Sequence, residues 1–166
     1  MTITRASFRT GFYAGLIVAV ALGAYLFQLW QPERQIALHS EHLLGAFERK
    51  DWRAIGDFID PAYGDQWHHD RTRLLASVRA VLQYTRNLHL QPREPLVVAT
   101  EHGPEWRARI VVSGDDNELT GLIKTRINPL PEPFRLEWRR QSWKPWDWKL
   151  IRASNEALAL PEAAGF

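Results

Sequence analysis

The chain has 166 residues, with 21 Lys and Arg against 19 Asp and Glu, and it contains no cysteine. The near-balance of charge excludes strong polyelectrolyte behaviour, and the lack of cysteine excludes disulfides, thiol nucleophiles and cysteine-based zinc sites. The length accommodates one domain and an appendage. Eight tryptophans are present, all but Trp30 beyond the N-terminal region, and they can fill a core or line a pocket.

An uncharged, mostly apolar stretch runs from Gly11 to Trp30. About 20 apolar residues at ~1.5 Å each cross a hydrocarbon core of roughly 30 Å, and Tyr13, Tyr25 and Trp30 stand where interfacial aromatic residues are expected. A cleavable signal peptide is the alternative, because Ala21-Leu22-Gly23 resembles a cleavage sequence. The apolar run continues past this sequence, so we predict a transmembrane anchor.

Charges beside this stretch indicate its orientation. Arg5 and Arg9 precede it with no acid among them, whereas the basic residues after it are mixed with acids. Because basic flanks favour the cytoplasmic side, we expect a cytoplasmic N-terminus and a domain on the extracytoplasmic, periplasmic side. Residues 1–31 would form the stub and anchor, 32–154 the domain and 155–166 a flexible tail.

Small residues recur at every fourth position of the expected anchor, at Gly11, Gly15, Ala19 and Gly23. Such a stripe lets two helix backbones approach closely in lipid. We therefore expect a homodimer through this stripe or through a face of the sheet. The alternative is that Gly and Ala are simply common in membrane helices.

Three amphipathic stretches after Pro32 predict helices. Pro32 suits a first helical turn, and Asp51 suits the cap of a short second helix that ends at Pro61. Asp70 suits the cap of a third helix. The apolar positions at helical spacing are Ile36, Leu43, Leu44 and Phe47, then Trp52, Ile55, Phe58 and Ile59, then Leu74, Leu75, Val78, Val81 and Leu82.

The remaining sequence alternates with a period of two, which is typical of strands. The positions on one face of the five expected strand regions are Leu88, Leu90 and Leu96–Ala99; Trp106, Ala108, Ile110 and Val112; Ile123, Thr125 and Ile127; Phe134, Leu136 and Trp138; and Trp146, Trp148 and Leu150. Pro92 and Pro95 are expected to interrupt the first region, and residues 113–117 to form a turn. Helices followed by hairpin-connected strands predict an α+β fold with an antiparallel sheet packed on its helices.

This order of elements resembles the nuclear transport factor 2-like superfamily, the cystatin-like α+β cone. The likeness covers residues 33–154 and rests on Phe47–Trp52, Ile59-Asp60-Pro61-x-Tyr63 and Trp146–Ile151. It implies a curved sheet wrapped around three helices, a conical pocket and frequent dimers. It does not imply one function, because members include ketosteroid isomerases, dehydratases, polyketide cyclases, transport adaptors, scaffolds and catalytically silent domains.

The richest polar cluster is Asp60–Asp70, which the resemblance places at the pocket mouth. Asp60 or Asp65 is a candidate general base and Tyr63 a candidate oxyanion donor, as proton abstraction next to a carbonyl requires. The structural alternative is that Asp60 belongs to a helix-ending turn, and nothing in the sequence defines a catalytic constellation.

Other candidates concern binding. Ligand contacts are expected from Tyr63, Trp67, His68, Trp138 and Trp146, with Trp143 as a further aromatic candidate, although tryptophan at strand spacing is more often core. His39 with His42, and His68-His69-Asp70, are weak metal candidates because a site needs three or four converging ligands. We therefore expect no metal and no cofactor.

One face of the expected sheet would be basic, with two acidic residues, Glu137 and Asp147, among the basic ones. The basic residues are Arg107, Arg109, Lys124, Arg126, Arg135, Arg139 and Lys149. Such a face can meet anionic lipid or an acidic partner, or its charges can pair across strands. Nucleic acid is disfavoured because aromatic residues do not alternate with these basic positions.

The resulting hypothesis is a membrane-tethered, non-catalytic domain that binds a partner protein or a small apolar ligand. An isomerase- or dehydratase-like enzyme acting on a hydrophobic substrate is the alternative. Assembly with a partner protein of the cell envelope is a third hypothesis.

Overall fold

The structure is a computed structural model that describes residues 5–115 and 117–159, with side chains described for 11–26, 30–115 and 117–159. Five helices and four strands follow one another in this described part. Their bounds are α1 Arg5–Leu29, α2 Pro32–Arg49, α3 Trp52–Phe58, α4 Arg71–Leu82, β1 His89–Thr100, β2 Gly103–Ser113, α5 Glu118–Ile127, β3 Phe134–Arg140 and β4 Trp148–Ser154.

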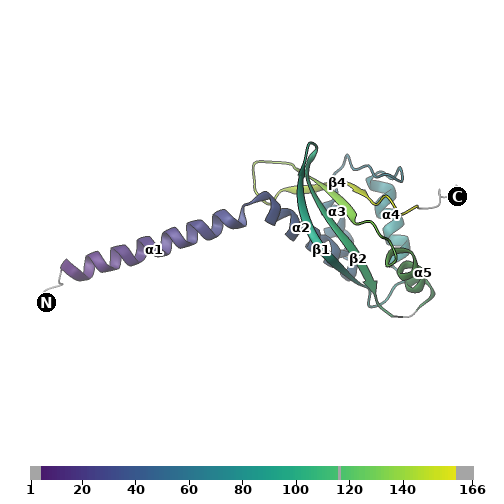
Figure 1. Cartoon of the computed structure of the whole chain (residues 1–166), viewed down its shortest axis with the longest axis horizontal. Coiled ribbons are helices and arrows are strands. Elements are labelled where there is room, and N and C mark those ends of the chain that lie inside the picture. The colour runs from purple at the N-terminus through teal and green to yellow at the C-terminus, as the bar shows by residue number, and fades with distance from the viewer. Residues whose placement is uncertain (1–4, 116, 160–166) are drawn as a thin grey trace.

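Helix α1 projects away from the rest of the chain as a long rod (Figure 1). Its large apolar side chains are exposed, among them Phe12, Ile17, Val18 and Leu22. In the described part of the chain, no helix has the combined length and hydropathy that a membrane crossing requires. The side chains of residues 1–10 and 27–29, which include the flanking Arg5 and Arg9 and part of the expected anchor, lie outside the described residues.

The remaining elements form an α+β domain with one antiparallel four-stranded sheet in the order β1-β2-β3-β4. Helix α2 and helix α3 supply Ile36, Leu43 and Ile55 to the core, which pack with the inward-facing Trp106 of β2 and Trp138 of β3. No core residue of the described chain comes from α1. The domain after Trp30 therefore has a hydrophobic core of its own.

The predicted starts of the helices are confirmed. Pro32 lies in the first turn of α2. The carboxylate of Asp51 accepts a hydrogen bond from the backbone N–H of Ala54 at 3.0 Å, and that of Asp70 accepts one from Arg73 at 2.8 Å. These are N-cap bonds, which satisfy amides that have no partner within their helix.

The strand expected at Ile123–Ile127 is wrong, because this segment forms α5. The side chain of Asn117 caps the helix by accepting from the backbone N–H of Thr120 at 2.7 Å. Ile123 and Ile127 are both half-buried against Leu82, Leu88 and Val112. Ile123 and Ile127 are four positions apart, a spacing that places two residues on the same face of a helix and also on the same face of a strand. Their spacing alone therefore does not distinguish a helix from a strand.

Two further strand boundaries differ from the prediction. Pro92 and Pro95 do not end β1; the strand has a β-bulge between Arg93 and Leu96, where Glu94 has a φ of 53°. Because β1 is an edge strand, it tolerates proline at positions whose nitrogen faces away from β2. Trp146 lies before β4, which begins at Trp148, and its side chain is exposed.

The hydrogen bond between the indole of Trp138 and Ser40 offers a test of the core. Trp138 Nε1 donates to Ser40 Oγ at 3.1 Å, and both residues are buried. We expect Ser40→Ala to lower the free energy of unfolding by about 1–3 kcal/mol, because it leaves a buried donor without an acceptor. Urea unfolding measures this loss. Trp138→Phe added to Ser40→Ala should cost less than the sum of the two single changes, and strict additivity would contradict the pairing.

Candidate functional site

A mostly apolar cavity of about 400 Å³ lies between the helices and the inner face of the sheet. Its apolar wall comes from α2, α4, α5 and the strands, and includes Leu43, Leu44, Phe47, Leu74, Val78, Val81, Leu82, Leu88, Leu90, Trp106, Ile110, Ile123, Ile127, Phe134, Leu136, Leu150 and Ala153. This volume falls within the range of small-molecule pockets, roughly 300–1,000 Å³. The conical pocket implied by the resemblance is therefore present.

The polar part of the wall comes from the loop between α3 and α4. Tyr63, Asp65, Trp67 and His69 all line the cavity, and the side chain of Asp65 is fully buried. Asp65 Oδ1 accepts hydrogen bonds from the backbone N–H groups of Trp67 and His69, at 2.9 and 2.8 Å. Backbone donors on a carboxylate compensate its burial. Asp65 therefore holds the loop in one shape.

The other oxygen of Asp65 contacts two side chains. Asp65 Oδ2 lies 3.3 Å from the hydroxyl of Tyr63, which donates to it, and 3.1 Å from Nδ1 of His69. The contact favours the His69 tautomer that carries its proton on Nδ1, which leaves a lone pair on Nε2. His69 thus lines the cavity with its ring held by Asp65 through Nδ1.

Tyr63 is the neutral member of this cluster. Burial, followed by the adjacent Asp65 carboxylate, raises the pKa of Tyr63 far above its ordinary value of 10.0. The phenol therefore keeps its proton and acts as a donor. With its four accepted hydrogen bonds, Asp65 is a positioning group rather than a free base.

Asp60 does not line the cavity. Its carboxylate is buried and accepts from Arg139 Nη2 at 3.0 Å, from the N–H of Ala62 at 2.8 Å and from the amide of Gln141. Its own N–H donates to the carbonyl of Leu150. Asp60 thus joins the end of α3 to β3 and β4, as the structural alternative predicted, and it is not placed to act as a base.

The segment after β4 closes against the same loop. Trp67 Nε1 donates to the carbonyl of Leu158 at 2.9 Å, and Leu158 lines the cavity. The Gln66 side chain donates to the carbonyl of Asn155 at 2.6 Å and accepts from its N–H at 3.1 Å. The first part of the expected tail is therefore hydrogen-bonded to the cavity loop, whereas residues 160–166 of that tail lie outside the described residues.

Three of the expected ligand contacts lie elsewhere. His68 is exposed, has a left-handed backbone with a φ of 61°, and does not line the cavity. Trp138 is packed in the core with its indole on Ser40, and Trp146 is exposed on the loop between β3 and β4. Tyr63 and Trp67 do line the cavity.

His69, which the sequence analysis named only within a weak metal candidate, was not predicted to line the cavity. The pattern contained a usable signal, because an Asp four residues before a His can accept from the histidine backbone and ring when the loop turns back on itself. The sequence analysis chose His68 as the ligand contact, whereas His68 has a left-handed backbone and an exposed side chain, and His69 lines the cavity.

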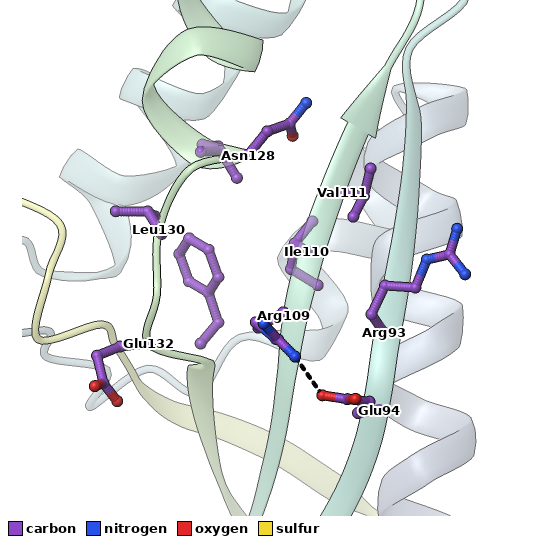
Figure 2. Close-up of a pocket in the computed structure, with 10 residues that line it drawn as sticks. Arg93, Glu94, Arg109, Ile110, Val111, Asn128, Leu130 and Glu132 are labelled. Carbon is purple, nitrogen blue, oxygen red and sulfur yellow. Dashed lines mark hydrogen bonds and ion pairs between the residues drawn. The ribbon is translucent and has the colours of Figure 1, made fainter.

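Figure 2 shows a second pocket, of about 450 Å³, between β2 and the link from α5 to β3. Ile110, Ile127 and Phe134 line both pockets and so form the wall between them. The charged side chains here face solvent, and Arg109 Nη2 pairs with Glu94 Oε2 at 2.6 Å. This pairing lowers the pKa of Glu94 and raises that of Arg109.

The expected basic sheet face is largely paired. Its ion pairs join Arg107 with Glu105, Arg109 with Glu94, Arg135 with Glu156, Arg139 with Asp60 and Arg152 with Glu137. Lys124 and Arg126 lie on α5 and not on a strand. For the described residues, no group of three His, Asp or Glu side chains is placed to hold a metal ion. His39 instead contacts two backbone carbonyls, those of Gln35 and Trp146.

Comparison with solved structures identifies the fold. Bd1075 from Bdellovibrio bacteriovorus matches with a TM-score of 0.55 and 10% identity over 73% of this chain, which spans 40% of Bd1075. An NTF2-like protein of unknown function from Pseudomonas putida matches with a TM-score of 0.54 and 14% identity, over 73% of this chain and 82% of that one. A cystatin-like protein of unknown function from Nostoc punctiforme gives 0.51 and 9%, over 72% and 85%.

These likenesses show that the domain has the NTF2-like, cystatin-like α+β fold, as the resemblance implied. At such low identity they carry the fold and not a function. Neither the protein-family models nor the curated protein sequences contain a match to this chain.

The raised pKa of Tyr63 predicts a specific alkaline instability. Above about pH 10 the unfolded chain releases the phenolic proton that the native state retains, so stability falls as pH rises past that value. We expect Tyr63→Phe to reduce this slope by up to one proton, measured by urea unfolding between about pH 9 and 11. Tyr84→Phe, at an exposed tyrosine, is the matched control. Equal slopes in wild type and Tyr63→Phe would contradict the buried phenol.

The bonds of Asp65 predict that its charge stabilises the loop. We expect Asp65→Asn to lower the free energy of unfolding by about 1–3 kcal/mol, because an amide cannot accept from all the donors that face this carboxylate. Asp57→Asn, at an exposed position of α3, should change stability little. Urea unfolding compares the two variants, and equal effects would count against the role of Asp65.

Proposed function

We propose that this chain is a membrane-tethered NTF2-like domain that binds a small apolar ligand in its cone. The observation that carries the proposal is the 400 Å³ cavity with apolar side chains on most of its wall and Tyr63, Asp65 and His69 on the rest. A pocket with a few converging polar groups in an apolar wall is typical of small-molecule sites.

The polar groups define the chemistry of the ligand. His69 Nε2 accepts a hydrogen bond from a hydroxyl or amine, and the apolar wall favours a hydrocarbon body. The proposed ligand is therefore a neutral hydrophobic molecule with one hydroxyl or similar polar group directed at the His69 side of the cone.

The tether is proposed for α1. The sequence from Gly11 to Trp30 carries no charge, and Ile17, Val18 and Val20 are each more than half exposed on a helix that projects from the domain (Figure 1). Large apolar side chains without a protein cover are stabilised by a lipid environment. The orientation proposed from Arg5 and Arg9 is a cytoplasmic N-terminus and a periplasmic domain. That the chain forms a homodimer, and that it assembles with a partner protein of the cell envelope, remain predictions.

Native mass spectrometry of residues 31–166 tests the binding proposal, because this part has its own core. We expect the domain to retain a co-purified small molecule. Ala153→Trp, which places a large side chain on the cavity wall, should reduce the liganded fraction severalfold, whereas Ala99→Trp, at an exposed strand position, should not. A folded domain without ligand in every preparation would contradict the proposal.

An isomerase- or dehydratase-like enzyme is the second candidate, and the His69–Asp65 contact favours it. An imidazole whose Nδ1 is held by a buried carboxylate can accept a proton at Nε2 and return it, while Asp65 stabilises the imidazolium. Tyr63 supplies a protonated donor in the same cluster.

The enzyme candidate is tested with the ligand recovered from the domain, incubated with purified protein and followed for chemical change. His69→Asn should lower turnover by about 100-fold or more, because it removes the base. His68→Asn removes an adjacent, exposed imidazole and should leave turnover unchanged. Recovery of the ligand unchanged would exclude the enzyme while leaving the binding proposal intact.

A further inference from the structure

The loop between β3 and β4 exposes two tryptophans that nothing in the described chain covers. The side chains of Trp143 and Trp146 are 83% and 58% exposed. Solvent-exposed tryptophan is costly, and two of them on one short loop mark an interaction surface. Neither residue lines the cavity described above.

The loop is held in a defined shape. Arg140 donates from Nη2 to the carbonyl of Trp143 and from Nε to that of Lys144, the latter at 3.1 Å. The backbone N–H of Gln141 donates to the carbonyl of Asp147 at 2.9 Å, and Trp148 Nε1 donates to that of Pro145 at 2.8 Å. The two indoles are therefore carried by a loop whose shape is fixed by hydrogen bonds.

The loop lies at the end of the domain from which α1 emerges. His39 of α2 contacts the carbonyl of Trp146 through Nε2 at 2.9 Å. His39 is seven residues into α2 from Pro32, which corresponds to about 10 Å of helix. In Figure 1 the connection before β4 reaches back toward the junction of α1 and α2. Trp30, at that junction, is 56% exposed.

We propose that the loop Gln141–Asp147 inserts Trp143 and Trp146 into the headgroup region of the membrane that holds α1. Tryptophan prefers this interface because its ring is apolar and its N–H is polar. Arg140 at the end of β3 and Lys144 in the loop are both exposed and favour a leaflet with anionic lipids. The inference rests on the proposed tether and adds a second contact that sets the domain against the bilayer.

Because the chain contains no cysteine, single-cysteine variants of the full chain can carry a nitroxide label at chosen depths. Ser142→Cys reports on the loop, Val18→Cys on α1, and Tyr84→Cys on an exposed site two residues after α4. Helix α4 lies on the side of the domain away from α1 (Figure 1). The proteins are reconstituted in vesicles of phosphatidylcholine with a minority of phosphatidylglycerol. Collision rates with oxygen and with a water-soluble nickel chelate then give each label's depth.

We expect the label at 142 to be protected from nickel at interfacial depth, the label at 18 to lie in the hydrocarbon, and the label at 84 to lie in water. Adding Trp143→Ala and Trp146→Ala should raise the collision rate of the label at 142 with the nickel chelate severalfold. A label at 142 as exposed as that at 84, or one that the alanine pair does not move, overturns the inference while the tether stands. A label at 18 in water overturns both.

Discussion

The candidate site depends on one buried carboxylate. Asp65 has a fully buried side chain, and its two oxygens accept from two backbone amides, the phenol of Tyr63 and the imidazole of His69. A buried charge is tolerated only when it is fully hydrogen-bonded. The loop between α3 and α4 must therefore close around Asp65, and that closure puts Tyr63 and His69 on the wall of the cone.

A second buried carboxylate holds this loop to the sheet. Asp60 bridges the end of α3 to Arg139 and Gln141, while the indole of Trp67 and the amide of Gln66 hold the segment after β4. The polar loop is thus attached on both sides, and the helices and strands around it are left to form an apolar wall. Rigid polar groups in an apolar cavity recognise a ligand without first paying for their own ordering.

The fold was largely predictable because its signals are local and periodic. The helix caps at Asp51 and Asp70 and the apolar faces of α2 and β2 follow from residue spacing alone. Helix α5 was not predictable from residue spacing, since the spacing of Ile123 and Ile127 fits both a helix and a strand. The Asn117 side chain, which caps the first turn, favours the helix. The site was only half predictable: Tyr63 and Asp65 stood out as polar residues, but the choice of His69 over His68 depends on a left-handed backbone that no spacing reveals. Trp138 and Trp146 were wrongly predicted to contact the ligand, because the sequence does not distinguish a tryptophan in a core from one in a cavity or on an exposed loop.

We propose that the cone holds an apolar molecule whose polar group hydrogen-bonds to His69. A crystal structure of residues 31–166, purified from cells with no ligand added, tests this most directly. We expect continuous electron density in the cavity, in contact with Ile110 and Phe134 and with one polar atom at hydrogen-bonding distance from His69 Nε2. A cavity filled by the protein's own side chains, or a His69 ring turned away from Asp65, would contradict it.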